Sequence, residues 1–296
     1  LEVTEARLSD VPGDAEAHGR GKALEALQRR AEAGDDYRAV LALAPANREA
    51  RAHLAGLLAY RHELRFGAGA DAYNRSDAAG LQTLAVRSRW SPQWATEFSF
   101  AAHQRFGAQV QRVGAQVDRR LGANWISVAA VQSSSGSVLA RREASGEFGR
   151  AFRLAGRFIL GLESSGQQRW LWFDGARVMV LSTSQLLYLP HDWTFLLTVR
   201  GARSSFDGAG SEWQPSGSVR LGFPLHRSLQ GHLDFGVGAE NFSQAEQVGH
   251  FAARDFGGGF KARLSPAQEI ALYVSRQLRS RGATQTSFGV TYAIRF

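Results

Sequence analysis

The chain of 296 residues has no cysteine and a single methionine, Met179. Without cysteine it contains no disulfide scaffold, no cysteine-ligated zinc, no iron–sulfur cluster and no thiol nucleophile. Lysine is also scarce, since Lys22 and Lys261 are the two lysines among 35 basic residues. The preference for arginine partly reflects codon usage, so it indicates no chemistry by itself. The chain begins at Leu1 rather than at methionine, which a cleaved signal peptide or a shortened chain would explain.

Long apolar runs are absent as well. Runs such as Trp193–Val199 are much shorter than the ~18 consecutive apolar residues of a membrane-spanning helix. The mean hydropathy of -0.25 is that of a soluble protein. A transmembrane β-barrel has a similar mean hydropathy, because side chains that face lipid alternate with side chains that face the lumen. Hydropathy therefore argues against membrane-spanning helices and leaves these two classes open.

Residues 1–62 have the composition and spacing of α-helices. Alanine, leucine, glutamate and arginine dominate, and apolar residues recur at helical intervals, as in Leu54, Leu57 and Leu58. Pro45 interrupts the pattern. Asn47 can cap the helix that follows, because an asparagine side chain accepts hydrogen bonds from the first backbone N–H groups of a helix. The sequence therefore predicts a short α-helical segment over residues 1–62.

The segment from Asp36 to Ala55 resembles part of a tetratricopeptide repeat, in which two helices rich in small residues flank a turn like Pro45-Ala46-Asn47. Residues 14–34 resemble a degenerate second repeat. Because stable arrays need about three repeats, the region is either a remnant that packs on the rest of the chain or the end of a longer array. A simple helical hairpin and a partner-binding module are both open interpretations.

From residue 63 onward, large apolar residues alternate with small or polar ones, which is the side-chain period of a β-strand. The same alternation recurs in the segments 195–199, 219–225, 233–239 and 270–274. Each such strand has one apolar face and one face of glycine, serine and charged residues. The alternation is clearest at the C-terminus, where the large apolar residues are Phe288, Val290, Tyr292, Ile294 and Phe296.

Three features favour a membrane barrel over a soluble β-sandwich. The predicted strands run for about 10–14 residues, longer than the ~5–6 of ordinary strands and close to the ~9–11 that cross a bilayer at a tilt. Most tryptophans fall near strand ends, where interfacial aromatic girdles lie. The printed sequence also ends on Phe296 directly after a strand. We therefore predict an all-β, up-and-down antiparallel transmembrane β-barrel over residues 63–296, with 12 or 14 strands because bacterial barrels have even strand numbers.

The links between strands are predicted in two classes, short on one side of the barrel and longer on the other, as in outer-membrane barrels. One of the predicted strands covers residues 156–164. Short turns are predicted at Pro224–Ser228, Ser265–Ala267 and Arg281–Gly282, and longer polar loops at Ser133–Glu143, Ser164–Arg169, Asp207–Gln214 and Ser243–Gly249.

The order of these parts resembles the YaiO-like family of outer-membrane β-barrels, in which tetratricopeptide-like helices around a Pro-Asn turn precede a single barrel. The residues that carry the resemblance are Pro45–Ala50, Leu64–Gly67 and Gly289–Phe296. The final alternation, ending in Phe296, is similar to the terminal-strand signal that the barrel-assembly machinery recognises. The chain differs from larger exopolysaccharide exporters, which join many tetratricopeptide repeats to one barrel.

The resemblance implies a location and a set of partners. It implies the bacterial outer membrane, with the helical N-terminus in the periplasm. The implied partners are outer-membrane lipids and lipopolysaccharide, the barrel-assembly machinery, and a periplasmic partner or a component of a polysaccharide system. The motifs are topological, so the resemblance describes the architecture more closely than the function.

No cofactor or metal site is predicted. His18, His53 and His62 are widely spaced and lack the intervals of metal ligands. The glycine-rich segments 236–238 and 257–259 lie inside predicted strands rather than between a strand and a helix, so neither is a dinucleotide-binding loop. Glycine there is more consistent with strand curvature or close packing in the lumen.

One group of residues suits a hydrolase. A serine hydrolase needs a base that touches the nucleophile and an acid that orients the base, and His226, Ser228 and Glu240 are of these types. Outer-membrane lipid A deacylases carry a similar His-x-Ser with a downstream Glu, but the Asn that follows Ser in that family is Leu229 here. The preferred interpretation is a polar turn and a lumen glutamate, and a lipid hydrolase is the alternative.

The excess of positive charge belongs to the predicted barrel. Residues 63–296 carry 26 Lys+Arg against 17 Asp+Glu, whereas residues 1–62 carry 9 against 10. An arginine that faces the bilayer centre costs about 2–4 kcal/mol, so arginines on the polar face are expected to line the lumen. There they favour anions or acidic sugar polymers, or they form ion pairs with acids such as Asp234, Glu240 and Glu269. The predicted lumen-lining arginines are Arg153, Arg200, Arg220, Arg263 and Arg295.

The predicted function is non-enzymatic: a pore or an accessory barrel in the export or surface handling of a polysaccharide or another anionic ligand. The alternative is a structural or assembly barrel whose helices dock a periplasmic partner. Nucleic acid is not an expected partner, because the chain has no basic stripe on a helix and no recognition motif.

Deletion of Phe296 is expected to lower the amount of assembled barrel in the outer membrane, because this residue ends the apolar row that resembles the assembly signal. The secreted precursor should remain intact. The measurement is the amount of heat-modifiable protein in outer-membrane fractions, since folded barrels migrate differently before and after boiling. Unchanged assembly of the truncated chain would remove this role from Phe296.

Overall fold

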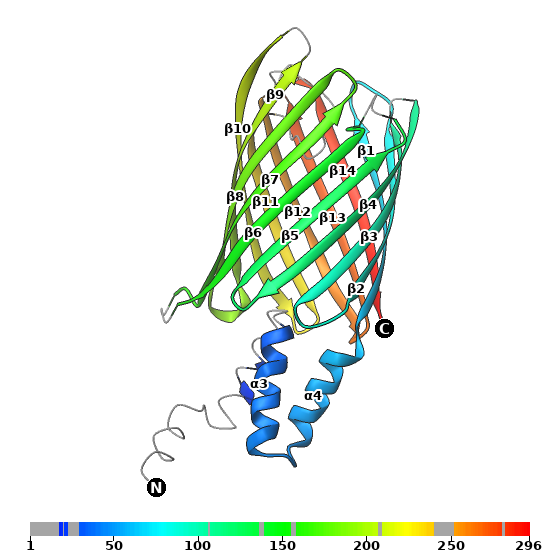
Figure 1. Cartoon of the computed structure of the whole chain (residues 1–296). Helices are drawn as coiled ribbons and strands as arrows, with labels where there is room; N and C mark the ends of the chain where they lie inside the picture. The colour runs from blue at the N-terminus through cyan, green and yellow to red at the C-terminus, as the bar shows by residue number, and fades with distance from the viewer. Residues whose placement is uncertain are drawn as a thin grey trace. The chain divides into compact units, whose positions relative to one another are not determined.

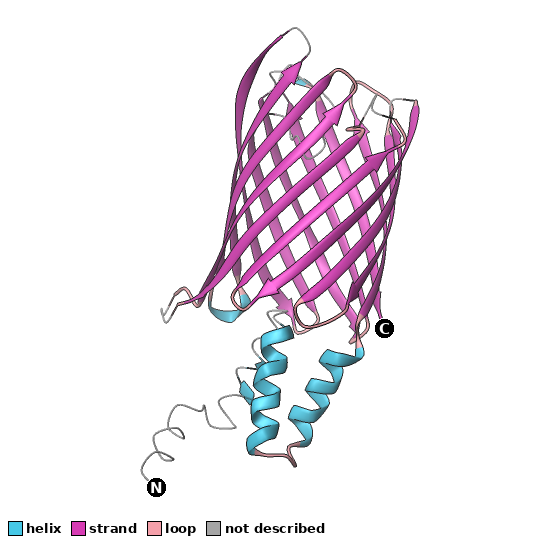
Figure 2. Ribbon diagram, in the orientation of Figure 1, coloured by secondary structure: helices cyan, strands magenta, loops and turns pink. Residues whose placement is uncertain are grey.

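The structure is a computed structural model, and it describes residues 18–19, 21–22, 30–105, 107–135, 139–154, 158–206, 209–239, 252–279 and 282–296. The chain divides at Arg61 and His62 into a helical unit and a β-sheet unit that extends to Arg295. Each unit is described by itself. Figure 2 shows helices in the first unit and a wall of strands in the second.

The helical unit contains α3 (Arg30–Leu43) and α4 (Arg48–Ala59). Pro45 lies in the turn between them. The side chain of Asn47 caps α4 by accepting a hydrogen bond of 3.0 Å from the backbone N–H of Ala50, which confirms the predicted cap. Two short helices do not establish a tetratricopeptide repeat. No helix in the described ranges is long and apolar enough to cross a membrane. The small core consists of Ala33, Tyr37, Val40, Ala50 and Leu57.

The β-sheet unit is a closed antiparallel barrel of fourteen strands in up-and-down order, with β1 paired to both β2 and β14 (Figure 1). The prediction of the barrel is confirmed, and fourteen is the correct choice of the two strand numbers. The strands are β1 His62–Tyr73, β2 Ala79–Arg89, β3 Trp94–Arg105, β4 Ala108–Leu121, β5 Asn124–Ser133, β6 Arg142–Arg153, β7 Gly161–Phe173, β8 Ala176–Tyr188, β9 Thr194–Phe206, β10 Ala209–His226, β11 Leu229–Ala239, β12 Ala252–Ser265, β13 Gln268–Arg279 and β14 Thr284–Arg295.

The barrel has two rims. The terminal rim is the one at which β1 begins and β14 ends, and the distal rim is the opposite one. In an up-and-down barrel every odd strand begins at the terminal rim and every even strand begins at the distal rim. A short 3₁₀ turn, η1 (Pro190–Asp192), links β8 to β9 at the terminal rim.

Two predicted loops and one predicted strand are wrong. The segment Ser164–Arg169 lies within β7. The predicted strand over residues 156–164 includes the link residues 158–160 and the first residues of β7, which begins at Gly161. The predicted loop Asp207–Gln214 is wrong over residues 209–214, because β10 begins at Ala209. In β7, Ser165, Gln167 and Arg169 lie on the polar inner face, where such residues are normal. The outward-facing Gly166 and Gln168 lack the large apolar side chains that mark a strand in the sequence. The predicted loop Ser243–Gly249 lies outside the described residues.

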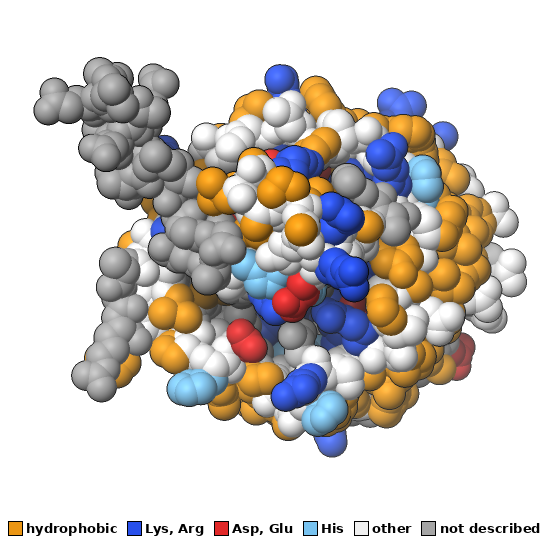
Figure 3. All heavy atoms as spheres, turned by 90° about the horizontal axis from the view of Figure 1, so that it is seen from below, with side chains coloured by type: hydrophobic (Ala, Val, Ile, Leu, Met, Phe, Trp, Pro, Cys, Tyr) orange, Lys and Arg blue, Asp and Glu red, His pale blue; other side chains and the backbone are white. Residues whose placement is uncertain are grey.

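The outer face of the barrel is apolar and exposed. Phe98 is 63% exposed and Leu233 is 58% exposed, although both are strand residues in the middle of the wall. Figure 3, which views the molecule along the barrel from the side of the terminal rim, shows hydrophobic side chains over much of the outer wall. Such a surface is stable in hydrocarbon rather than in water. The fold is that of an outer-membrane β-barrel.

Aromatic rings on the inner face lie flat over glycines of the neighbouring strand. The indole of Trp125 covers Gly149, where an added Cβ would lie about 2.0 Å from the ring. Tyr273 similarly covers Gly289. Trp125 is therefore an exception to the prediction that the tryptophans form an outer girdle. These glycines leave room for large rings to fold against the wall.

Replacement of Gly149 by alanine is expected to destabilise the barrel by about 1–3 kcal/mol, because the new methyl group overlaps the Trp125 ring and forces it out of its packed position. Gly146 on the same strand is the matched control: it has no heavy atom near its added Cβ. The measurement is urea-induced unfolding of the refolded protein in lipid vesicles. Equal stability of the Gly149→Ala and Gly146→Ala variants would contradict the packing role of Gly149.

Candidate functional site in the barrel lumen

The lumen is accessible to water. Most inner-face side chains are only half-buried, and Tyr273 remains 45% exposed although it points into the barrel. Two cavities of about 270 and 180 Å³ lie against the inner wall, and Tyr273 lines both of them. Charged and hydroxyl side chains line these cavities, so the interior suits polar solutes.

The larger cavity is lined by residues of β9 to β13 and contains both charge signs. Arg220 donates from Nε to Asp234 at 2.5 Å, across the pair β10–β11. Arg200 donates from Nη1 to the hydroxyl of Ser218 at 3.3 Å. No carboxylate within the described part of the chain lies at ion-pair distance from Arg200, so its charge is available to a solute. The carboxylate of Asp255 also lines this cavity.

The smaller cavity lies beside a link that packs against the inner wall. The link between β5 and β6 carries Leu139 and Ala140, which are 6% and 4% exposed. Ser133 donates from its hydroxyl to the carbonyl of Ala140 at 2.7 Å. Ala140 packs in one apolar cluster with Leu171, Val178, Val180 and Ala202 on β7 to β9. Leu139 and Ala140 also line the cavity, so this link narrows the lumen near the distal rim.

Glu143 holds two arginines at the edge of this cavity. It accepts from Nε and Nη2 of Arg169 at 2.7 and 2.9 Å, and from Nη2 of Arg112 at 2.9 Å. These charge-assisted bonds join β4, β6 and β7. The Nε of Arg112 is buried and has no hydrogen-bond acceptor.

A second polar cluster lies on the other wall of the same cavity. Asp71 accepts from the hydroxyl of Ser287 at 2.6 Å and from Arg105 at 3.2 Å. Arg105 also contacts the hydroxyl of Tyr73, and Arg279 donates to Gln285 at 2.6 Å. These contacts connect β1 and β14 to β3 and β13 across the inner face.

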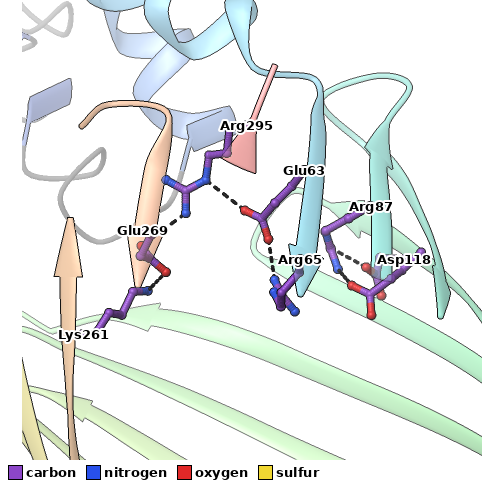
Figure 4. Close-up of polar contacts among 8 residues, drawn as sticks. Glu63, Arg65, Arg87, Asp118, Lys261, Glu269 and Arg295 are labelled. Carbon is purple, nitrogen blue, oxygen red and sulfur yellow. Dashed lines mark hydrogen bonds and ion pairs between the residues drawn. The ribbon is translucent and has the colours of Figure 1, made fainter. Parts of the chain in front are cut away.

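Ion pairs follow the inner face near the terminal rim (Figure 4). Arg295 on β14 contacts Glu63 on β1 at 2.9 Å and Glu269 on β13 at 3.3 Å. Glu269 also accepts from Lys261 at 3.0 Å, and Glu63 pairs with Arg65 at 2.5 Å. Figure 4 also shows a second group, in which Arg87 pairs with Asp118. Arg87 also lies 3.6 Å from Glu97. The first group joins the first strand of the barrel to the last.

The register places all five arginines predicted to line the lumen on the inner face. Arg200 and Arg220 share the larger cavity, whereas Arg295 belongs to the ion pairs near the terminal rim. Arg153 and Arg263 lie at strand ends at that rim and are exposed. Arg220 and Arg295 form ion pairs with carboxylates, whereas, among the described residues, Arg200 does not. The two expected roles of lumen arginines, ion pairing and attraction of anions, therefore apply to different residues.

Sequence reasoning missed Arg105, Arg112 and Arg169. Each falls on the polar parity of its strand, so the alternation could have found them. Glu143, the partner of Arg112 and Arg169, was assigned to a loop, and Arg169 to the end of another loop. The pairing of Glu143 with both arginines depends on strand register, which the sequence pattern does not reveal.

The residues of the hydrolase alternative do not form a described triad. Nδ1 of His226 lies 3.3 Å from the hydroxyl of Ser228, and both side chains are exposed beside the two-residue turn at the terminal rim. Glu240 lies outside the described residues. Ala239, which precedes it, ends β11 at the distal rim, about 33 Å from Ser228 along an eleven-residue strand. In the described part of the chain no carboxylate is paired with His226.

The histidines of the helical unit are closer than their spacing suggests. The ring of Tyr37 stacks on His53 with 5.1 Å between centroids, and His18 meets Tyr37 edge-on at 5.8 Å. Glu49 lies 3.4 Å from Nε2 of His18. The ammonium of Lys22, which donates to Glu49, holds the pKa of that carboxylate below its ordinary value. Within the described ranges, no set of three His, Asp or Glu side chains is arranged to hold a metal ion.

Comparison with solved structures finds outer-membrane proteins of low sequence identity. No protein-family model matches the chain, and comparison with curated proteins also gives no match. A bacterial polysaccharide outer membrane secretin matches with 11% identity and a TM-score of 0.48, over 80% of this chain and 99% of that one. Omp33 of Acinetobacter baumannii matches with 10% identity and a TM-score of 0.49, over 80% and 98%.

A third similar structure is an anion-selective porin from Comamonas acidovorans. It matches with 8% identity and a TM-score of 0.45, over 79% of this chain and 98% of that one. At these identities and TM-scores, the similarity carries no argument about the fold or the function of this chain.

Replacement of Glu143 by glutamine is expected to destabilise the barrel by roughly 1.5–3 kcal/mol, because it removes the charged acceptor of two half-buried arginines. Asp234→Asn is the matched control: its partner Arg220 is 54% exposed, so the expected loss is below ~1 kcal/mol. Urea unfolding in lipid vesicles, followed by tryptophan fluorescence, measures both. An equal loss in the two variants would contradict the structural role of Glu143.

Proposed function

We propose that this protein is a non-enzymatic outer-membrane pore that passes small polar solutes with a preference for anions. The observation that carries the proposal is a closed wall with an exposed apolar outer face and a water-accessible inner face that bears arginines. The proposed location is the bacterial outer membrane, with the helical unit in the periplasm. The barrel-assembly machinery is the proposed partner for insertion.

The length of the strands fits a bilayer. A twelve-residue strand such as β13, at ~3.4 Å per residue and a tilt of ~40°, rises about 30 Å. The apolar band of outer-membrane barrels is ~25 Å tall. Each strand can therefore cross the hydrocarbon region and keep its ends in the headgroup layers. A soluble protein with this outer face would expose one continuous apolar surface to water, which is a strong aggregation hazard.

The preference for anions follows from the inner-face charges. On the described part of the inner face, lysine and arginine outnumber aspartate and glutamate. Many of these arginines are neutralised by ion pairs, but Arg200 has no carboxylate partner among the residues that the structure describes. Charged groups in a confined, low-dielectric channel raise the local concentration of counter-ions. Asp255 opposes this effect in the larger cavity, so we expect a moderate preference rather than strict selectivity.

An acidic polysaccharide or its fragments are the proposed natural cargo. This part rests on the resemblance to the YaiO-like family and on the inner-face arginines, which suit uronate carboxylates. An accessory role in polysaccharide export is the corresponding biological setting. Oligosaccharides of a uronic acid should interrupt the ionic current of the reconstituted barrel more strongly than neutral oligosaccharides of equal length.

A structural barrel is the second candidate function. The ion pairs that link neighbouring strands on the inner face favour it, because they stiffen the wall whether or not solute passes. In that case the helical unit would dock a periplasmic partner. Intact insertion into planar bilayers without any steady current would support this candidate against the pore.

Replacement of Arg200 by glutamine is expected to lower the ratio of anion to cation permeability on the order of twofold, because it removes an unneutralised lumen charge. Asp255→Asn should raise the ratio, since it removes an opposing charge from the same cavity. Arg254→Gln is the matched control, because Arg254 lies on the outer face of β12 beside Asp255. The reversal potential across a planar bilayer in a salt gradient measures all three. Equal reversal potentials in the Arg200 and Arg254 variants would contradict the proposed role of Arg200.

A further inference from the structure

The charged side chains of the barrel are divided unequally between its two faces. Every aspartate and glutamate on a described strand lies on the inner face. The outer face of the described strands carries basic residues without any carboxylate. Part of the positive charge that sequence analysis assigned to the barrel is therefore on the outside. The outer-face arginines are Arg119, Arg142, Arg150, Arg177, Arg203, Arg254 and Arg276.

The largest group of these arginines lies at the distal rim on β6 to β9. Arg142 is the first residue of β6, and Arg177 is the second residue of β8. The register places Trp172 of β7 directly between them, opposite Arg142 on one side and Arg177 on the other. Arg203 of β9 lies in the next row, opposite Met179. The basic side chains thus flank one exposed indole.

The aromatic rings hold this group at the membrane interface. Trp170 and Trp172 stack with 6.5 Å between centroids and 20° between planes. The guanidinium of Arg177 lies 5.6 Å from the centroid of Trp170. Tryptophan on the outer face marks the headgroup level of a bilayer. An arginine costs about 2–4 kcal/mol at the bilayer midplane but only ~0–1 kcal/mol near the interface, so this position is one where arginine is tolerated and meets headgroups.

The two arginines are spaced to share a ligand. Neighbouring strands lie ~4.8 Å apart, so β6 and β8 are separated by ~10 Å, a distance that two arginine side chains can bridge. No carboxylate in the described ranges is paired with Arg142 or Arg177. The acid in the adjacent turn, Asp174, lies 3.6 Å from Arg141. The charge of Arg142 and Arg177 is thus available to a ligand in the headgroup layer.

We propose that Arg142, Arg177 and Trp172 form a binding site for the phosphate groups of lipopolysaccharide in the outer leaflet. Guanidinium groups bind phosphate through paired hydrogen bonds, and the indole between them packs on the sugar or acyl part of the glycolipid. The inference rests on the proposed membrane location. It also assigns the orientation of the barrel, because it places the distal rim at the cell surface and the terminal rim in the periplasm.

The test is native mass spectrometry of the refolded full chain in detergent, titrated with bisphosphorylated lipid A. The variant R142Q/R177Q is expected to bind lipid A at least about 10-fold more weakly than the unaltered chain, because two charged hydrogen-bond partners are lost. The matched control is R119Q/R150Q, which removes two outer-face arginines near the terminal rim. It should bind lipid A as the unaltered chain does. Heat-modifiable migration of both variants verifies that they are folded.

Three results would overturn the inference. One is equal lipid A binding by the two double variants. Another is a loss of affinity in the R142Q/R177Q variant that is as large for dephosphorylated lipid A as for bisphosphorylated lipid A, which would assign the effect to packing alone. The third is a loss of affinity for phosphatidylglycerol in the R142Q/R177Q variant that equals its loss for lipid A, which would assign the site to phospholipid in general. The ionic-current measurements on the Arg200 variants are independent of this titration. If the barrel conducts as expected but the R142Q/R177Q variant binds lipid A as the unaltered chain does, the lipopolysaccharide site is contradicted and the proposed pore function is not.

Discussion

The structure depends on the closure of β1 onto β14. In hydrocarbon no water is present to bond an open sheet edge, and each unsatisfied backbone group costs several kcal/mol. The pairing runs from Glu63 with Arg295 to Tyr73 with Gln285 and leaves neither strand with a free edge. The ion pairs of Arg295 with Glu63 and Glu269 lie on the inner side of the same junction. They add contacts between the first and last strands that only the closed form contains.

Closure fixes the two faces of every strand, and the chemistry of the lumen follows from that. Side chains of one parity must be compatible with lipid, so polar chemistry is confined to the other parity. Glycine on the inner face makes room for large rings, as Gly149 does for Trp125 and Gly289 for Tyr273. The rings lie along the wall, and the cavities on either side of Tyr273 remain accessible. A wall with bulkier inner residues at these positions would push the rings into the channel.

The alternation in the sequence was sufficient to predict the barrel and most of its strands. It succeeds where lipid-facing residues are large, as in β13 and β14. It fails at Ser164–Arg169 in β7, where Gly166 and Gln168 face outward and weaken the apolar signal. The inward parity of Arg200 and Arg220 was also predictable from alternation. The partners of these arginines were not, because cross-strand contacts depend on register and on the neighbours of each strand.

The candidate site shows the same limit. Glu143, Arg112 and Arg169 lie on three strands and meet because β6 pairs with β7 in one register; a shift of one residue would turn Glu143 toward lipid. The inward packing of Leu139 and Ala140 depends on an apolar patch assembled from β7, β8 and β9. No local pattern in residues 134–141 indicates it. Such sites are properties of the assembled wall rather than of any segment.

Because charge is divided between the two faces, the net charge of the chain does not determine the ion selectivity of the lumen. The inner face holds the strand carboxylates, and several neutralise an arginine at hydrogen-bond distance. A paired charge produces a short-range dipole that is screened within the ~8–10 Å Debye length of physiological salt. The arginines of the outer face contribute to the pI of 10.5 but are separated from the lumen by the wall. The ion selectivity of the lumen therefore depends on the few inner-face charges without an opposite partner, of which Arg200 is the main one. The excess positive charge of the sequence is divided between the lumen and the membrane-facing surface.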